Sequence, residues 1–132
     1  GGTFSAGWSV DYASSNPTFL VGISDWFGTT ENSGFSSDGG KTWQKFEGLP
    51  SWAMTTVGGS IAASTTKNFI WVAAGNQPPA YTLDGGKTWQ NVSIAGVTDW
   101  TQVHSTYYLA RTTITADRVQ PNTFYLYDTN SG

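Results

Sequence analysis

Few side chains in this sequence could take part in a reaction. Four carboxylates fall in segments that we expect to be long loops, namely Asp25, Glu31, Glu47 and Asp99. Glycoside hydrolysis needs two carboxyl groups, roughly 5–10 Å apart, on either side of the bond that breaks. No spacing in the sequence pairs two of these carboxylates. A single histidine, His104, cannot form a metal site alone, and no Ser or Cys stands beside an evident base. We therefore assign no catalytic residue, no metal and no cofactor.

The same segments carry aromatic rings and polar groups that suit a sugar ligand. They are expected at residues 24–34, 47–59, 75–80 and 93–109. Long loops on a rigid scaffold commonly carry function. Exposed rings can stack on the apolar faces of pyranoses, although each ring could instead pack beneath its own loop. The predicted ligand-binding residues are Asp25, Trp26, Phe27, Trp52, Asp99, Trp100, His104, Tyr107 and Tyr108.

The composition of the 132 residues limits the class of protein and of partner. Charged residues make up only 11 % and aromatic residues 15 %, which is unlike a disordered chain. The net charge is −3 and no cluster of Lys or Arg exists, so binding to nucleic acid or to an anionic membrane is not expected. No run of about 18 apolar residues could span a membrane. With no cysteine, disulfides are excluded.

An internal repeat indicates the fold. The segment SSDGGKTWQ at 36–44 recurs as TLDGGKTWQ at 82–90, so that Asp84 follows Asp38 by 46 residues. This period lies within the roughly 40–50 residues of β-propeller blades. Short apolar runs bounded by Asn, Pro, Gly and Ser, such as those at 8–13, 60–64 and 112–117, predict strands. We predict an all-β chain of four-stranded antiparallel propeller blades.

The repeat divides residues 1–132 into about two and a half blades. The first is expected at about 7–47, the second at about 58–94, and the start of a third at about 110–130. In such blades the short turns gather at one end of the sheets and the long loops at the other. An incomplete ring exposes strand edges and apolar faces, so we expect other blades or self-association to cover them.

The repeated turn has the residues of an Asp box. Its aspartate can accept hydrogen bonds from the amides that follow, and its two glycines allow positive φ. Its tryptophan is expected to pack between neighbouring sheets. The structural residues of this motif are Asp38, Gly40, Thr42, Trp43, Asp84, Gly86, Thr88 and Trp89. Elsewhere, Asp117 and Arg118 are candidates for a structural ion pair.

The order of these motifs resembles that of a known family. The two Asp boxes, the strand start NPTF at 16–19, GGSIAAS at 58–64 and ADRVQPNTFY at 116–125 are together similar to the C-terminal propeller of glycoside hydrolase family 74, the endo-xyloglucanases. The resemblance runs from about residue 9 to residue 128. It implies a parent with two seven-bladed propellers, a β-1,4-glucan cleft between them, and two aspartates that hydrolyse the glycan with inversion. No position here matches either catalytic motif, and the resemblance places the C-terminal aspartate upstream of Gly1.

The leading interpretation is a segment of a secreted xyloglucan or β-1,4-glucan endo-hydrolase-like propeller. It would carry part of the glycan-binding face and be inactive alone, so the sequence leaves open whether the chain acts as an enzyme. One alternative is a non-catalytic carbohydrate-binding module. Another is a sortilin-type protein-interaction propeller, against which the lack of cysteines weighs. A sialidase would need an arginine cluster that Arg111 and Arg118 alone cannot supply.

Overall fold

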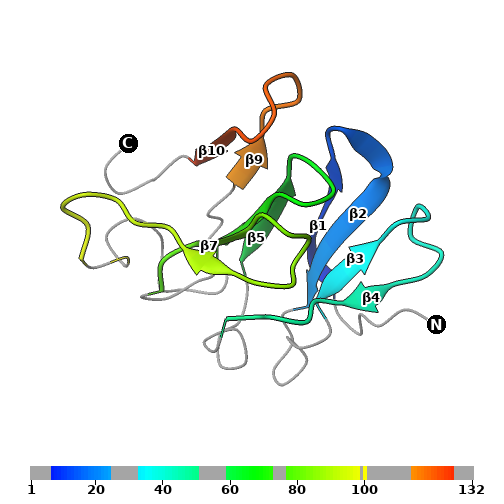
Figure 1. Cartoon of the computed structure of the whole chain (residues 1–132), viewed down its shortest axis with the longest axis horizontal. Coiled ribbons are helices and arrows are strands. Elements are labelled where there is room, and N and C mark those ends of the chain that lie inside the picture. The colour runs from blue at the N-terminus through cyan, green and yellow to red at the C-terminus, as the bar shows by residue number, and fades with distance from the viewer. Residues whose placement is uncertain are drawn as a thin grey trace.

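The computed structural model describes residues 7–24, 33–50, 59–72, 77–98, 100 and 114–126. Within these residues the chain forms ten β-strands in three antiparallel sheets (Figure 1). The same residues include no helix that is long and apolar enough to cross a membrane.

The first two sheets have four strands each, joined in chain order. The first contains β1 (Gly7–Ala13), β2 (Asn16–Ser24), β3 (Gly34–Ser36) and β4 (Gln44–Lys45). The second contains β5 (Ser60–Ala63), β6 (Phe69–Val72), β7 (Ala80–Thr82) and β8 (Gln90–Asn91). The third pairs β9 (Ile114–Ala116) with β10 (Phe124–Leu126). The predicted all-β class with four-stranded antiparallel blades is confirmed.

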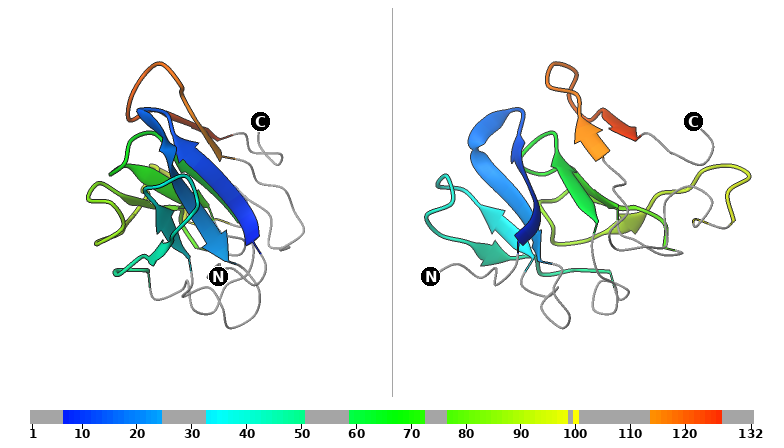
Figure 2. Two further views of the ribbon diagram at one scale, coloured as in Figure 1. Left: turned by 90° about the vertical axis from the view of Figure 1, so that its right-hand side faces the viewer. Right: turned by 180° about the vertical axis from the view of Figure 1, so that it is seen from behind.

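The three sheets follow one another as consecutive blades of an open propeller. Their first strands are neighbours, with β5 between β1 and β9 in both Figure 1 and the right-hand view of Figure 2. The strand registers define equivalent positions: Tyr12 pairs with Leu20 in the first sheet, and Ala63 pairs with Phe69 in the second. In the third sheet, Ala116 pairs with Phe124 in the same way.

The main core lies between the first and second sheets. Its buried residues are Ala13, Phe19, Val21, Ile23, Phe46, Ile61, Ala63, Phe69 and Trp71. The Phe46 ring, which follows β4, lies 5.6 Å from the ring of Phe69 and 5.3 Å from that of Trp89. Burial of each such side chain contributes about 1.5–3 kcal/mol. The rings of Phe19, Phe46 and Phe69 thus help to hold the first sheet against the second.

A second, smaller core joins the second and third sheets. It consists of Ala62, Val72, Ile114 and Ala116, with Ile70, Phe124 and Leu126 packed against it. Along β5, Ile61 and Ala63 therefore face the first sheet and Ala62 faces the third. This alternation follows from the two-residue period of a strand, and it gives the second sheet two apolar faces.

Hydrogen bonds also join the first strands of successive sheets. A first strand is the edge of its own sheet, so alternate backbone amides have no partner strand and need other acceptors. The Ile61 amide donates to Ser9 Oγ at 3.1 Å, and the Ala63 amide donates to Asp11 Oδ2 at 2.9 Å. The contact recurs one sheet later, where the Ile114 amide donates to Ser60 Oγ at 3.4 Å. Polar side chains of each first strand thus cap the edge of the next.

Arg118, just after β9, connects the third sheet to the first. Its guanidinium donates to Asp11 Oδ1 at 2.8 Å and to the Tyr12 carbonyl at 2.9 Å, and it lies 4.1 Å from the centre of the Tyr12 ring. The sequence suggested an ion pair between Arg118 and Asp117. That prediction is wrong, because Arg118 pairs with Asp11. The carboxylate of Asp117 instead accepts the Val119 and Gln120 amides and the Tyr125 hydroxyl. These bonds lower the pKa of Asp117 and raise that of Tyr125.

Replacing Gly86 by alanine tests the packing between the first two sheets. Gly86 has φ 90° and a methyl group there would overlap the Phe46 ring, whereas the equivalent Gly40 has φ 89° but its methyl would lie 3.4 Å from Leu20 Cδ1. Both substitutions should cost about 1–2 kcal/mol for the left-handed backbone. Gly86→Ala should cost about 1–3 kcal/mol more through overpacking. Urea unfolding of both variants measures the difference, and equal losses would contradict this packing.

Candidate functional site

Most of the predicted ligand-binding residues lie outside the described residues. These are Asp25, Trp26, Phe27, Trp52, Asp99, His104, Tyr107 and Tyr108. Trp100 is described, and its side chain is buried with 7 % exposure. A ring buried to this degree offers little surface on which a sugar could stack. The ligand-binding role of all nine residues stays a prediction.

The first repeated turn, residues 38–43, is organised around one carboxylate. Asp38 Oδ1 accepts the Thr42 amide at 2.9 Å and the Ser36 hydroxyl at 2.8 Å, and Oδ2 accepts the Thr42 hydroxyl at 2.6 Å. The Gly39 and Gly40 backbones adopt φ of 71° and 89°, which a side chain would disfavour. The residue types of the motif are therefore those that the turn itself requires.

The second turn, residues 84–89, repeats this geometry. Asp84 Oδ1 accepts the Thr88 amide at 2.9 Å and the Thr82 hydroxyl at 2.8 Å, and Oδ2 accepts the Thr88 hydroxyl at 2.6 Å. The Gly85 amide donates to the Lys67 carbonyl at 3.0 Å, which fixes the turn against the β5–β6 connection. The equivalent bond in the first sheet runs from the Gly39 amide to the Thr18 carbonyl.

These hydrogen bonds set the protonation state of the two aspartates. The Thr42 hydroxyl and amide, followed by the Ser36 hydroxyl, lower the pKa of Asp38 to about 2. The Thr88 hydroxyl and amide likewise lower the pKa of Asp84 to about 2. A general acid needs a pKa near the working pH, so neither group is suited to donate a proton in glycoside hydrolysis. Their role is in the turn.

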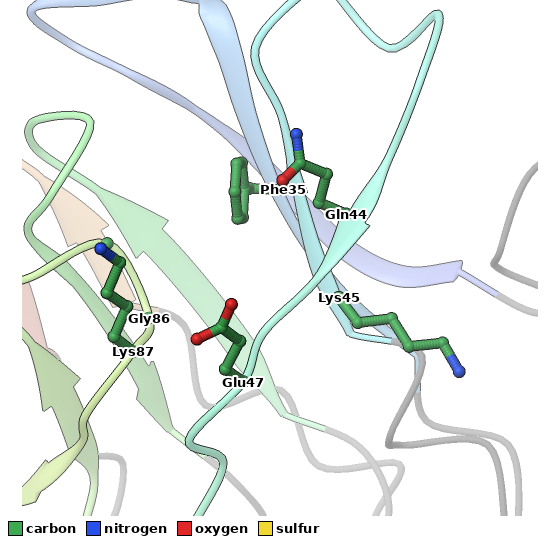
Figure 3. Close-up of a pocket in the computed structure, with 7 residues that line it drawn as sticks. Phe35, Gln44, Lys45, Glu47, Gly86 and Lys87 are labelled. Carbon is green, nitrogen blue, oxygen red and sulfur yellow. The ribbon is translucent and has the colours of Figure 1, made fainter.

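A small hollow lies between the end of the first sheet and the second turn (Figure 3). Its volume is about 120 Å³, and its lining residues are Phe35, Gln44, Lys45, Glu47, Gly85, Gly86 and Lys87. In Figure 3 the Glu47 and Lys87 side chains approach from the two sheets, while Lys45 points away. The hollow offers a ring edge, an amide and opposite charges for polar contacts. Glu47 is the one carboxylate that lines it, so it lacks an acid–base pair.

A second hollow of about 230 Å³ lies beside Arg118. Its other lining residues are Ser14, Ser15, Ser64, Val119 and Pro121. The Arg118 guanidinium already donates to the Ser14 hydroxyl at 3.0 Å in addition to its bonds to β1. Both hollows are therefore bordered by short turns, and neither is lined by any of the nine residues predicted to bind ligand.

Comparison with known proteins relates this fold to a group of enzymes. No protein-family model matches the chain, and no curated protein matches it. Among solved structures, the GH74 xyloglucanase from Xanthomonas campestris matches 95 % of this chain with 27 % identity and a TM-score of 0.65. The GH74 enzyme from Niastella koreensis matches 92 % with 23 % identity and a TM-score of 0.63. YCF48 from Cyanidioschyzon merolae matches 92 % with 14 % identity and a TM-score of 0.57.

These matches show the fold of a glycoside hydrolase-related propeller. The chain spans only 16 % of the Xanthomonas protein and 15 % of the Niastella protein, and 31 % of YCF48. It therefore resembles a part of each. The likeness to YCF48, at 14 % identity, is one of fold alone, and a shared fold does not by itself fix a reaction.

Acid titration tests the role of the two turn carboxylates. Because the pKa of each is lowered to about 2 from 3.8, the stability they contribute is present above about pH 4 and is lost as the pH falls toward 2. The double variant Asp38→Asn, Asp84→Asn should have a lower melting temperature at pH 6. Its melting temperature should also fall less steeply than that of the wild type between pH 4 and pH 2. Thermal unfolding by circular dichroism across this range measures both, and parallel curves would contradict the assignment.

Proposed function

We propose that this chain is a glycan-binding segment of a secreted propeller protein related to the GH74 xyloglucanases, with xyloglucan or another β-1,4-glucan as its ligand. The observation that carries the proposal is the match to the Xanthomonas xyloglucanase over 95 % of the chain. The motif order found in the sequence supports the same family. The repeated turns at 38–43 and 84–89 are, in this proposal, Asp boxes that stabilise blades.

The charge and ring content of the chain support a neutral polysaccharide ligand. Charged residues are only 11 % of the chain, and seven tryptophans are present. Several of these rings are used in the core, as Trp71 and Trp89 show by their contact at 6.4 Å between ring centres. Trp26 and Trp52 fall in the expected long loops and are the best candidates for contact with sugar.

The described carboxylates support binding without hydrolysis. Asp11 is paired with Arg118, and Asp38, Asp84 and Asp117 are held by hydrogen bonds that lower their pKa values. Glu47 lines the small hollow without a second carboxylate. The described part of the chain thus lacks the pair of carboxyl groups, one of them protonated, that an inverting glycosidase requires.

Titration calorimetry with xyloglucan oligosaccharides tests the proposal. We expect binding, with Trp26→Ala and Trp52→Ala each weakening the affinity about tenfold, or about 1.4 kcal/mol, through loss of a stacking ring. The control is Leu83→Ala, which removes a 57 % exposed side chain immediately before the second turn and should leave the affinity unchanged.

A reducing-end assay on the same samples separates binding from turnover. We expect no release of reducing ends over buffer alone. Release by the wild-type chain would refute the non-catalytic part of the proposal. Absence of binding, or equal affinities of the wild type and both tryptophan variants, would refute the glycan-binding face.

A further inference from the structure

The last strand of the second sheet ends in a tripeptide with the pattern of an acceptor for N-linked glycosylation. Residues 91–93 read Asn-Val-Ser, and the middle position is not proline, as the pattern requires. Asn91 is the last residue of β8, and both Asn91 and Ser93 are exposed. The asparagine that would carry a glycan and the serine that completes the pattern therefore both lie at the surface of the folded chain.

The exposure of Asn91 persists although a neighbouring sheet packs on the same side. Asn91 pairs with Ala80, and Ala80 pairs with Trp71, so the three side chains share one face of the second sheet. Trp71 belongs to the core that the first sheet covers, and Trp89 packs against that core from two positions before Asn91. Adjacent blades of a larger propeller would pack on the far faces of the first and third sheets, and they would leave Asn91 uncovered.

The local backbone leaves the Asn91 side chain free to carry a bulky group. The next residue is fixed by its main chain, since the Val92 amide donates to the Pro79 carbonyl at 2.8 Å. The Asn91 carboxamide makes no hydrogen bond within the described part of the chain. A buried asparagine of the same sheet shows the contrast, because Asn68 Nδ2 donates to the Thr82 carbonyl at 3.0 Å. A glycan on Asn91 would thus disrupt no such bond.

A second Asn-x-Ser/Thr triplet provides a comparison within the chain. Asn16, Pro17 and Thr18 are all exposed, but the proline excludes this triplet from the acceptor pattern. Asn16 Oδ1 accepts the Thr18 amide at 3.3 Å and the Thr18 hydroxyl at 2.8 Å, at the start of β2. The two triplets are both accessible and differ at the middle position, so only Asn91 is expected to be modified.

We propose that Asn91 carries an N-linked oligosaccharide. In the transfer, Asn91 Nδ2 attacks the anomeric carbon of an oligosaccharide linked to a lipid diphosphate. A C–N bond forms, the bond from that carbon to the diphosphate oxygen breaks, the lipid diphosphate leaves, and the amide releases one proton to water. The sugar would project from β8, the edge strand of its sheet, and would hinder the addition of another strand there. The inference rests on the secretion included in the proposed function.

Translation of the chain behind a signal peptide, in the presence of endoplasmic-reticulum microsomes, tests the modification. Chains that resist added protease have entered the lumen, and peptide N-glycosidase then removes any N-linked glycan. The lumenal wild type should migrate one glycan above the 14.2 kDa polypeptide and return to that mass after digestion. Asn91→Gln and Ser93→Ala should stay at the polypeptide mass, whereas Ser93→Thr should keep the glycan because threonine also satisfies the pattern.

Pro17→Ala is the matched control, because it converts the second exposed triplet into a permitted one. This variant should carry two glycans, and it shows that the transferase reaches the chain. A lumenal wild type without a glycan would overturn the proposal. A Pro17→Ala chain modified at Asn16 but not at Asn91, or a glycan that persists in Asn91→Gln, would overturn it equally.

This result is separate from that of the calorimetry. The mass of the lumenal chain does not depend on its affinity for xyloglucan, so a chain that binds no oligosaccharide could still be modified at Asn91. Conversely, an unmodified Asn91 would leave the binding proposal intact.

Discussion

The open edge of each first strand is the constraint on which the arrangement of the three sheets depends. A short strand at the edge of its sheet leaves alternate amides without strand partners, and burying them unpaired would cost about 1–3 kcal/mol each. Ser9 and Asp11 provide acceptors for Ile61 and Ala63, while Ile61 and Ala63 bury their side chains in the same contact. Polar capping and apolar burial thus act on one strand, and Arg118 adds a further connection through Asp11.

Much of this fold could be predicted from the sequence, because turn chemistry is local. The DGGKTW segments specify their turns through residues within four positions of each other, so their recurrence fixes the order of strands. Contacts between sheets are different. The Asp11–Ala63 bond joins residues 52 positions apart and leaves no periodic pattern. For this reason the sequence suggested Asp117 as the partner of Arg118, although the turn after β9 already uses that carboxylate.

The candidate site could be predicted only as residue types on expected loops. Trp89 packs on Phe46, which follows the first sheet, and on Trp71 in the second sheet. Trp43 has the same local sequence, but it donates its indole N–H to the Gly40 carbonyl within its own turn. The surroundings of a tryptophan therefore depend on which sheet lies beside it, and local sequence cannot specify this. For the same reason, the sequence could not indicate that Trp100 is buried. A reaction is harder still to predict from the sequence, because the hydrogen bonds of the folded turns determine the pKa values of their carboxylates.

Amide hydrogen exchange at Ile61 and Ala63 in dilute protein tests the central claim most directly, because both amides lie on the edge that the first sheet caps. Capping by Ser9 and Asp11 predicts that both exchange as slowly as the amides that pair within β6, and that Asp11→Ala speeds exchange at Ala63 more than within β6. Exchange of Ile61 and Ala63 at the rate of exposed turn amides, with β6 still protected, would contradict the account.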